Sequence, residues 1–234
     1  MIYFALREAA LGGLEEIFII INEKKADLMD YLLSGVFRED LEGEGIKGVP
    51  RVNLIEQPSP FGSGDAIYRA KEGVGNEAFA LLMPDFLLVG APPPLSQMKG
   101  AFERFGRETV GVILLEKGEE DSYGNVGILE VTPLGDDILK VKEMSGKRDA
   151  PLRLSGGRAY KAVGRWILFP SFFSLLEEMR GEGGEWDDTP AMRRLCQEGR
   201  VVGKILQGKG FDLGNRGGYE AAREWLKGAS LFSP

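Results

Sequence analysis

The sequence contains no histidine and a single cysteine, Cys196. Without histidine the chain can build neither a Ser-His-Asp nor a Cys-His catalytic arrangement, and the usual histidine-containing zinc sites are excluded as well. A single cysteine cannot form an internal disulfide, which is typical of proteins from reducing compartments. Cys196 also lacks a histidine base, so we expect it to be a buried small apolar residue and not a nucleophile. Acid–base or metal chemistry must therefore come from Asp, Glu, Lys, Arg or Tyr.

Positive charge is scarce, because 29 Lys and Arg residues face 36 Asp and Glu residues, for a formal net charge of -7. Nucleic acids and anionic membranes bind clustered positive charge, so we expect neither as a partner. No signal-peptide pattern is evident, and the longest apolar stretch, 78–95, is interrupted by Asp85 and four prolines. The expectation is a cytoplasmic protein whose 234 residues form one large domain.

Short apolar runs alternate with helical patterns through the first half of the chain. This rhythm predicts an α/β fold with a Rossmann-like, mostly parallel sheet flanked by helices. Beyond residue 116 the pattern indicates a small antiparallel subdomain. The predicted strands are 17–21, 51–57, 78–83, 109–115, 126–131, 138–143, 160–168 and 201–206, and the predicted helices lie near 2–11, 28–33, 65, 97–105, 172–179 and 217–227.

Three polar signals fall where predicted elements meet, and ligands of open α/β sheets bind at the carboxyl ends of the strands. Gln57 precedes a glycine-containing loop at 60–65, Asp85 directly follows an apolar strand, and Asp212 precedes the last helix. Each has a plainer interpretation as a turn or helix-cap residue. If Asp85 and Asp212 reach one crevice, they can form a two-carboxylate Mg²⁺ site for phosphate transfer. Spacing alone does not bring them together.

Seven segments, in the same order along the chain, resemble motifs of the bacterial UTP–glucose-1-phosphate uridylyltransferase (UDP-glucose pyrophosphorylase) family. ALLMPDFLL is similar to its strand ending in L-P-D-D, and KAVGRWIL to its A-I-V-G-R-Y-V-L strand. The others are MIYFALREAALGGLEEIFII, EQPSPFGSGDAIYRAK (for Q-x-x-x-x-G-L-G-H-A-V), SYGNVGI (for R-Y-G-I-V), GEGGEWDDTPAM (for G-A-G-G-E-I-Q-L-T-D-A-I) and FDLGNRGGYEAAREW (for D-C-G-N-K-L-G-Y). The resemblance therefore covers nearly the whole chain.

The resemblance implies a nucleotide site and a metal site. Gln57 would contact the uracil, and Gly62 would lie beside the nucleoside. Asp85 and Asp212 would hold Mg²⁺ as the cofactor. The implied reaction is attack by the phosphate oxygen of glucose 1-phosphate on the α-phosphorus of UTP, which releases pyrophosphate. No covalent enzyme intermediate is needed, because positioning and charge neutralisation suffice.

On the sugar-phosphate side, the resemblance assigns Gly124, Glu143 and Glu185 to the lining of the site. Gly214 would keep the loop that carries Asp212 tight. The implied partners are UTP or a UDP-sugar and a sugar 1-phosphate, and the family suggests a homo-oligomer.

The same resemblance implies a single nucleotidyltransferase-like domain over 1–234. Within it, 1–116 would form the nucleotide-side half and 117–234 the sugar-side half.

Two departures from the family pattern bear on activity. The printed sequence contains neither the glycine-rich G-x-G-T-R loop nor the P-K-E-M-L-P segment, so the first strand of the family is missing. The family's E-K-P triplet reads Glu143-Met144-Ser145, which places methionine where the family has a phosphate-binding lysine. Lys142, Lys147 or Arg148 are candidates to replace that lysine.

Without the first strand, the strands at 17–21 and 78–83 would each expose an unpaired apolar edge. Three hypotheses remain open from the sequence. The chain is an active uridylyltransferase for glucose 1-phosphate or a related sugar phosphate. It is a non-catalytic homologue that binds a nucleotide sugar or a partner subunit in a regulatory role. Or it is a fragment of an enzyme whose start lies upstream.

Overall fold

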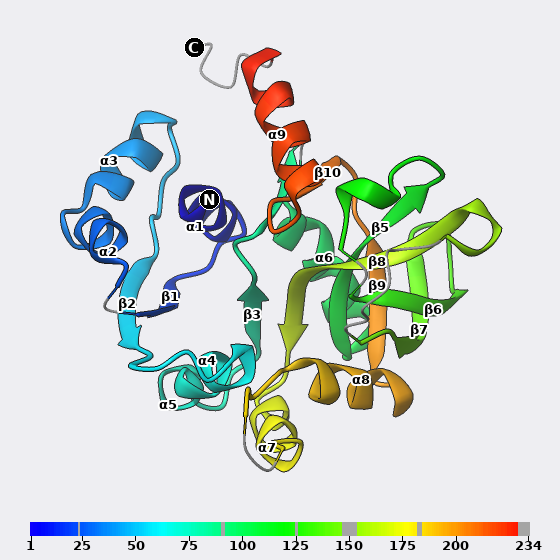
Figure 1. Ribbon diagram of the computed structural model, residues 1–234. Coiled ribbons are helices and arrows are strands. Elements are labelled where there is room, and N and C mark those ends of the chain that lie inside the picture. Colours follow the sequence, from blue (N-terminus) through cyan, green and yellow to red (C-terminus); the bar gives the residue numbers. More distant parts are fainter. Residues whose placement is uncertain (23, 90–91, 125, 147–153, 182–183, 229–234) are drawn as a thin grey trace.

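The computed structural model describes residues 1–22, 24–89, 92–124, 126–146, 154–181 and 184–228, which form helices around three sheets (Figure 1). In chain order the elements are α1 (Ile2–Leu11), β1 (Glu16–Ile21), α2 (Ala26–Leu33), α3 (Val36–Gly43), β2 (Arg51–Glu56), α4 (Ser63–Arg69), α5 (Lys71–Val74), β3 (Phe79–Leu82), β4 (Phe86–Val89), α6 (Pro94–Phe105), β5 (Glu108–Glu116), η1 (Glu120–Ser122), β6 (Ile128–Pro133), β7 (Ile138–Met144), η2 (Ser155–Gly157), β8 (Arg158–Leu168), α7 (Ser171–Glu178), α8 (Thr189–Gln197), β9 (Val201–Ile205), β10 (Lys209–Asp212) and α9 (Arg216–Gly228). None of the helices among these residues has the length and apolarity that a membrane span requires.

The N-terminal part of the fold is a two-stranded parallel sheet, β1–β2, packed against the first three helices. β1 is an apolar run after Glu16, and its Ile17 and Ile19 side chains face the same small core as those of the helices. That core contains Leu6 of α1, Leu32 of α2 and Leu41 of α3, each at most 5% exposed. Burial of these amphipathic helix faces holds the unit together.

The main sheet has six strands in the order β3-β8-β5-β9-β7-β6, and the start of β8 also pairs with β6. The expected α/β fold, a central sheet flanked by helices, is confirmed. The sheet is mixed, however: β5–β9 is parallel, whereas β8 runs antiparallel to β3, β5 and β6. The parallel share is therefore smaller than expected. A continuous apolar run such as that of β5 indicates burial on both faces but carries no information on strand direction, and β5 has one antiparallel and one parallel neighbour.

Apart from the short helices α5, η1 and η2, the described residues contain four elements that the sequence pattern did not predict: α3, α8, β4 and β10. The two strands are only four residues long, so neither shows a recognisable alternation of apolar and polar residues. They pair with each other in an antiparallel two-stranded sheet. This small sheet is decisive for the position of the acidic residues described below.

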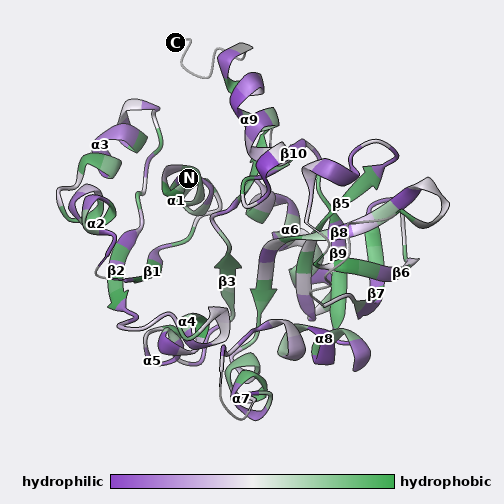
Figure 2. Ribbon diagram, in the orientation of Figure 1, coloured by the Kyte–Doolittle hydropathy of each residue, from purple (hydrophilic) through white to green (hydrophobic). Residues whose placement is uncertain are grey.

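The expected apolar edges are present on β1 and β3. In the part of the chain that the structure describes, β1 pairs with β2 alone and β3 with β8 alone. All four residues of β3 are apolar and partly exposed, and Figure 2 shows this strand as hydrophobic. Each strand thus keeps one edge without a strand partner among the described residues. Natural proteins usually cover such an edge with a helix or loop, or place charged side chains on it.

Cys196 lies on α8 and is 1% exposed, which confirms the expectation of a buried apolar-type residue. Burial raises the pKa of its thiol to about 12. We expect Cys196 to react with a disulfide reagent at pH 8 on the order of a thousandfold more slowly in the native protein than in the denatured chain. Absorbance of the released thiol measures both rates, and equal rates would contradict the buried position.

Candidate functional site

Asp85 and Asp212 converge at one point of the structure. Asp85 immediately precedes β4, Asp212 ends β10, and the register of the two strands sets Asp212 opposite Phe86. The backbone N–H of Leu213 donates a hydrogen bond of 2.7 Å to the carbonyl oxygen of Asp85. A Cβ atom placed on Gly214 would lie 3.3 Å from Oδ2 of Asp85 and 3.4 Å from Oδ1 of Asp212. The two carboxylates therefore face the same small space.

Glycines after Asp212 allow the chain to turn tightly beside these carboxylates. The N–H of Gly214 donates to Oδ1 of Asp212 at 3.2 Å. A side chain on Gly218 would overlap the carbonyl oxygen of Asp212, so this close approach of α9 requires glycine. Asn215 accepts hydrogen bonds from the N–H groups of Gly217 and Gly218, at 2.9 and 3.3 Å, and so caps the start of α9.

A buried lysine that the sequence pattern did not single out lies beside the acidic pair. Lys161 of β8 is 6% exposed, and its Nζ donates to the carbonyl oxygens of Gly124, at 3.0 Å, and Val126, at 2.6 Å. The N–H of Gly124 donates in turn to Oδ2 of Asp212 at 2.9 Å. Burial lowers the pKa of Lys161, while the charges of Asp212 and Asp85 act against that shift. β8 also contains Arg158 and Arg165, so no local pattern of the strand distinguished Lys161 as a buried residue.

The donor set of this region fits a hard divalent cation. It offers carboxylate oxygens from Asp85 and Asp212, which face one point. Among the described residues, no group of three or more His, Cys, Asp or Glu side chains could hold a metal by itself. Two carboxylates supplemented by substrate phosphates and water are the usual surroundings of Mg²⁺, whereas soft or borderline metals prefer sulfur or imidazole.

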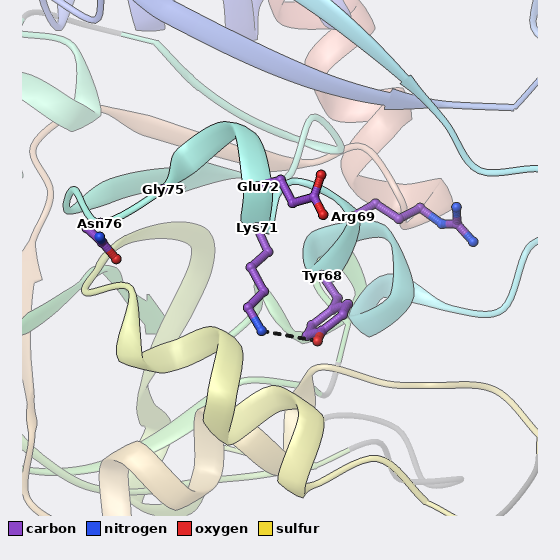
Figure 3. Close-up of a pocket in the computed structure, with 6 residues that line it drawn as sticks. All are labelled: Tyr68, Arg69, Lys71, Glu72, Gly75 and Asn76. Atoms are coloured by element: carbon purple, nitrogen blue, oxygen red, sulfur yellow. Dashed lines mark hydrogen bonds between the residues drawn. The ribbon is translucent and has the colours of Figure 1, made fainter.

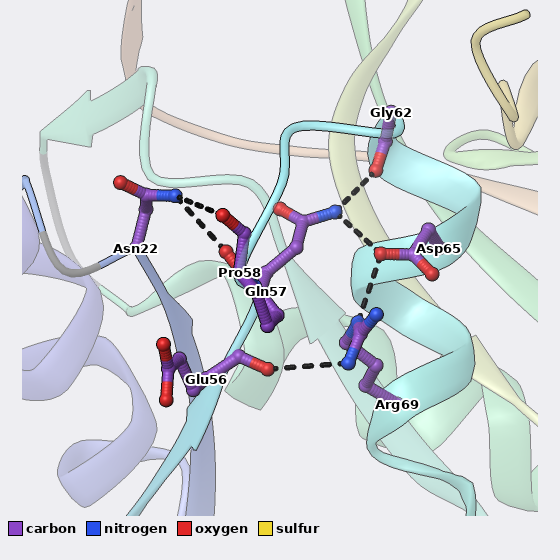
Figure 4. Close-up of polar contacts among 7 residues, drawn as sticks. All are labelled: Asn22, Glu56, Gln57, Pro58, Gly62, Asp65 and Arg69. Atoms are coloured by element: carbon purple, nitrogen blue, oxygen red, sulfur yellow. Dashed lines mark hydrogen bonds and ion pairs between the residues drawn. The ribbon is translucent and has the colours of Figure 1, made fainter.

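Gln57 lies at the end of β2 and is held by the loop that follows it (Figure 4). Its Nε2 donates to the carbonyl oxygen of Gly62 at 3.0 Å and to Oδ2 of Asp65 at 2.8 Å. Arg69 donates to the same Asp65 oxygen at 2.8 Å. Burial alone would raise the pKa of Asp65, but the hydrogen bonds from Arg69 and Gln57 outweigh it and lower that pKa. Because the amide nitrogen is bound to two oxygens, the amide oxygen of Gln57 is the atom left to accept from a ligand.

Gly62 and Glu185 lie next to each other, although they are far apart in the sequence. The segment around Gly62 forms backbone hydrogen bonds with Trp186: the Trp186 N–H donates to Phe61 at 2.5 Å, and the Gly64 N–H donates to Trp186 at 2.7 Å. A Cβ on Gly62 would lie 2.8 Å from Cγ of Glu185 and would overlap the carbonyl oxygen of Trp186. The buried Trp186 was not singled out from the sequence, yet it fixes this contact.

Replacement of Gly62 by alanine should destabilise the protein by about 2–3 kcal/mol, because Gly62 has φ = 109° and no space for a side chain. The matched control is Gly100→Ala in α6, where nothing lies within 4 Å of the added Cβ. That change should stabilise the helix by about 0.5–1 kcal/mol. Urea denaturation measures both, and equal effects of the two changes would contradict the tight packing at Gly62.

The remaining predicted residue, Glu143, is bound elsewhere. Its carboxylate accepts hydrogen bonds from Arg193, at 3.1 Å, and Gln197, at 2.8 Å, both on α8. The hydrogen bond from Gln197, followed by that from Arg193, lowers the pKa of Glu143. Met144 is 4% exposed and belongs to the main core. The structure therefore brings Asp85, Asp212, Gly124 and Gly214 into one group and Gln57, Gly62 and Glu185 into a second.

The candidate lysine replacements have different outcomes. Lys142 is exposed and pairs with Glu130 at 3.8 Å on the surface of β6 and β7. Lys147 and Arg148 lie outside the described residues.

A surface hollow of about 470 Å³ lies on α4 and α5, and none of the eight predicted residues lines it (Figure 3). Two of its lining residues are in contact, since Nζ of Lys71 donates to the hydroxyl of Tyr68 at 3.2 Å. Its lining consists of Tyr68, Arg69, Lys71, Glu72, Gly75 and Asn76. Neither Asp85 nor Asp212 lines this hollow. We therefore place the candidate site where these two carboxylates converge.

Comparisons with known proteins agree with the resemblance seen in the sequence. UTP–glucose-1-phosphate uridylyltransferase YngB of Bacillus subtilis (strain 168) is 28% identical, with 95% of this chain and 77% of that protein covered. The UTP–glucose-1-phosphate uridylyltransferase of Mycoplasma genitalium is 29% identical, with 93% and 77% covered. Among solved structures, a UDP-glucose pyrophosphorylase complexed with UDP-glucose superimposes with a TM-score of 0.79 at 26% identity, over 97% of this chain and 87% of that one.

The family model described as Nucleotidyl transferase matches residues 1–226, nearly the whole chain. Together with the fold and the relatives above, this match confirms the expected resemblance: the chain belongs to the nucleotidyl transferase family.

Proposed function

We propose that this chain transfers the uridylyl group of UTP to a sugar 1-phosphate, with glucose 1-phosphate as the first candidate acceptor. The observation that carries the proposal is the convergence of Asp85 and Asp212 beside Gly214. Two carboxylates that face one point can hold a divalent cation, which in turn binds phosphate groups. Transfer of a uridylyl group between phosphorylated substrates requires such neutralisation of the phosphate charge. The relatives named above act on UTP and glucose 1-phosphate by their names, which supports the choice of substrates.

In the proposed reaction, an oxygen of the sugar phosphate forms a bond to the α-phosphorus of UTP. The bond from that phosphorus to the oxygen bridging to the β-phosphorus breaks, and pyrophosphate leaves. Asp85 and Asp212 would hold Mg²⁺, which when bound offsets the negative charge that the phosphates bring together. The residues of the chain would hold the sugar phosphate in line with the α-phosphorus of UTP. Two substrates oriented in this way react directly, without a covalent enzyme intermediate.

The second group of residues would bind the nucleotide and the sugar. The amide oxygen of Gln57 can accept the N3–H of uracil, since its amide nitrogen is already bound to Gly62 and Asp65. The exposed carboxylate of Glu185, next to Gly62, is suited to accept sugar hydroxyls. Glu143 is tied to α8 and has no part in this proposal.

A second candidate function is binding of a nucleotide sugar without transfer, in a regulatory role. It is favoured by Met144, which lies buried in the core where the family motif E-K-P has a phosphate-binding lysine. Within the described residues, β1 and β3 also keep the open sides noted above. A site with intact acidic residues but fewer phosphate donors would bind a UDP-sugar better than it would activate UTP.

One experiment separates the two functions. Pyrophosphate release is measured with UTP, Mg²⁺ and a panel of sugar 1-phosphates, and UDP-glucose binding is measured by calorimetry on the same protein. Turnover that is lost in Asp85→Ala and Asp212→Ala, but kept in the control Asp30→Asn on the exposed side of α2, supports transfer. UDP-glucose binding without turnover supports the regulatory role. If neither is detected, both functions are rejected.

A further inference from the structure

The side-chain amide of Gln57 is fixed in one orientation by the chemistry of its partners. Its Nε2 donates to the carbonyl oxygen of Gly62 and to Oδ2 of Asp65, so both of its N–H groups are bound (Figure 4). A carbonyl group and an ionised carboxylate can only accept hydrogen bonds. A reversed amide would place the oxygen of Gln57 against these two oxygens. The nitrogen of the amide therefore faces inward, and its oxygen faces outward.

Asp65 is itself held in place by Arg69, which lies one helical turn further along α4. Nε of Arg69 donates to Oδ2 of Asp65 at 2.8 Å, and a terminal nitrogen of Arg69 donates to the carbonyl oxygen of Glu56 at 3.3 Å. The side chain of Asp65 is only 14% exposed. Residues four apart on a helix are neighbours, so this pair needs no rearrangement of the helix. Arg69 thus joins α4 to the end of β2 and keeps the carboxylate against Gln57.

The amide oxygen of Gln57 is available to a ligand. The backbone of this residue is fixed at the end of β1, since its N–H donates to Ile21 at 2.8 Å and its carbonyl oxygen accepts from Asn22 at 3.0 Å. Figure 4 shows the amide oxygen pointing away from the two acceptors that bind the nitrogen. Among the described residues, the one fully buried side-chain polar atom without a partner belongs to Glu8. The amide oxygen, to which no described residue donates, is therefore open to solvent.

A fixed acceptor distinguishes between pyrimidine bases. Uracil has an N–H donor at N3, whereas cytosine has an acceptor nitrogen at the same position. An outward amide oxygen pairs with the first base and repels the second. A site built to bind one donor strongly rejects an analogue that lacks it, because the polar group of the site is then left unpaired. If the amide were free to turn over, its N–H group would suit cytosine as well. Selectivity therefore depends on the residue that prevents this turn.

We propose that Asp65, held by Arg69, is a positioning residue that makes the nucleotide site selective for uracil over cytosine. The inference rests on the proposed function, because it determines which base Gln57 accepts. The resemblance does not imply it: aligned letter by letter, Asp65 stands where the family motif Q-x-x-x-x-G-L-G-H-A-V has histidine. A histidine ring nitrogen can donate or accept, whereas a carboxylate only accepts. The aspartate of this chain therefore permits only one orientation of the amide.

The test is calorimetric binding of UDP-glucose and CDP-glucose to the full chain with Mg²⁺ present. The two ligands differ only in the base, so the ratio of their Kd values measures base selectivity. We expect the unchanged protein to bind UDP-glucose roughly 100-fold more tightly, and Asp65→Ala to lower this ratio about tenfold. A merely structural loss would weaken both ligands alike and leave the ratio unchanged.

Two variants serve as comparisons. Asp65→Asn keeps an acceptor oxygen that Arg69 can hold, so its ratio should stay within about threefold of that of the unchanged protein. The control Asp30→Ala, on the exposed side of α2, should leave the ratio unchanged. Because Asp65 acts through Gln57, adding Asp65→Ala to Gln57→Ala should not change the ratio further. Thermal denaturation verifies that each variant is folded.

The outcomes separate this inference from the proposed function. A ratio that falls less than about threefold in Asp65→Ala overturns the role of Asp65, even if uridylyl transfer is observed. An unchanged protein that binds both ligands equally, or neither of them, overturns it as well. A ratio that depends on Asp65 in the absence of any turnover supports the role of Asp65, while it rejects transfer. If Asp65→Ala does not fold, Arg69→Met takes its place, and the same threefold limit decides.

Discussion

Replacement of Asp212 by asparagine should lower the kcat of UDP-sugar formation roughly 100- to 1000-fold. Asparagine has the shape of aspartate and can still accept from the N–H group of Gly124, so the loop before α9 should remain in place. The substitution removes one negative charge from the space beside Gly214 that the two carboxylates face. Initial rates of pyrophosphate release at saturating UTP and sugar phosphate measure the effect. Circular dichroism and thermal denaturation verify the fold.

The same substitution at Asp85 allows a sharper test. If both carboxylates bind one cation, Asp85→Asn and Asp212→Asn remove parts of one unit, and the double variant should lose little more than the worse single variant. If they act independently, the logarithms of the two losses should add. Additive losses would show that the acidic pair does not share a cation. Titration with Mn²⁺ gives a readout that does not depend on turnover, and both single variants should bind it more weakly than Asp30→Asn.

The second large effect concerns Arg165, which is 2% exposed and the largest fully buried side chain among the described residues. Its Nε donates to Oε2 of Glu8 at 2.8 Å. Its two terminal nitrogens donate to the carbonyl oxygens of Met83, at 2.5 Å, and Phe86, at 2.8 Å. These two carbonyl groups flank Asp85, so the guanidinium group of Arg165 fixes the turn that carries this carboxylate and ties it to α1.

Arg165→Met should lower the free energy of unfolding by about 3–5 kcal/mol, because it leaves Glu8 buried without its partner and two carbonyl groups without a donor. The control is Arg158→Met on the same strand, where an arginine 68% exposed pairs with Glu116 at 3.1 Å. That change should cost at most about 0.5 kcal/mol. Urea denaturation at pH 7 compares the two, and similar losses would mean that Arg165 has no special structural role.

The pH dependence follows from Glu8. Burial raises the pKa of Glu8 above its ordinary value, and the charge of Arg165 opposes that shift. A raised pKa in the folded state means that protonation of Glu8 favours folding, so the stability it contributes is present at low pH and is lost as the pH rises. Without Arg165 this shift should grow. The destabilisation of Arg165→Met should therefore be smaller at pH 5 than at pH 7.

The local pattern of residues predicted most of the secondary structure and the α/β class. Apolar runs at β1, β3 and β5 indicated buried strands, because burial of both faces leaves a direct trace in the sequence. β5 is buried along nearly its whole length, whereas β3 is partly exposed. The same pattern placed Gln57 and Asp85 at strand ends, where the structure has them. Lys161 escaped notice because a lysine is ordinarily a surface residue, and only its neighbours in space show that it is buried.

The sequence by itself determined which residues are available for chemistry: with no histidine and a single cysteine, Asp, Glu, Lys, Arg and Tyr remain. The tertiary structure alone decided which of them meet. Asp85 and Asp212 become neighbours because two four-residue strands, β4 and β10, pair in one register, and Glu143 is hydrogen-bonded to Arg193 of α8. The periodicity of apolar residues relates positions two to four apart in the sequence. Strand pairing joins segments that are far apart in the chain, and it depends on burial and on the course of the loops, which no short sequence pattern encodes.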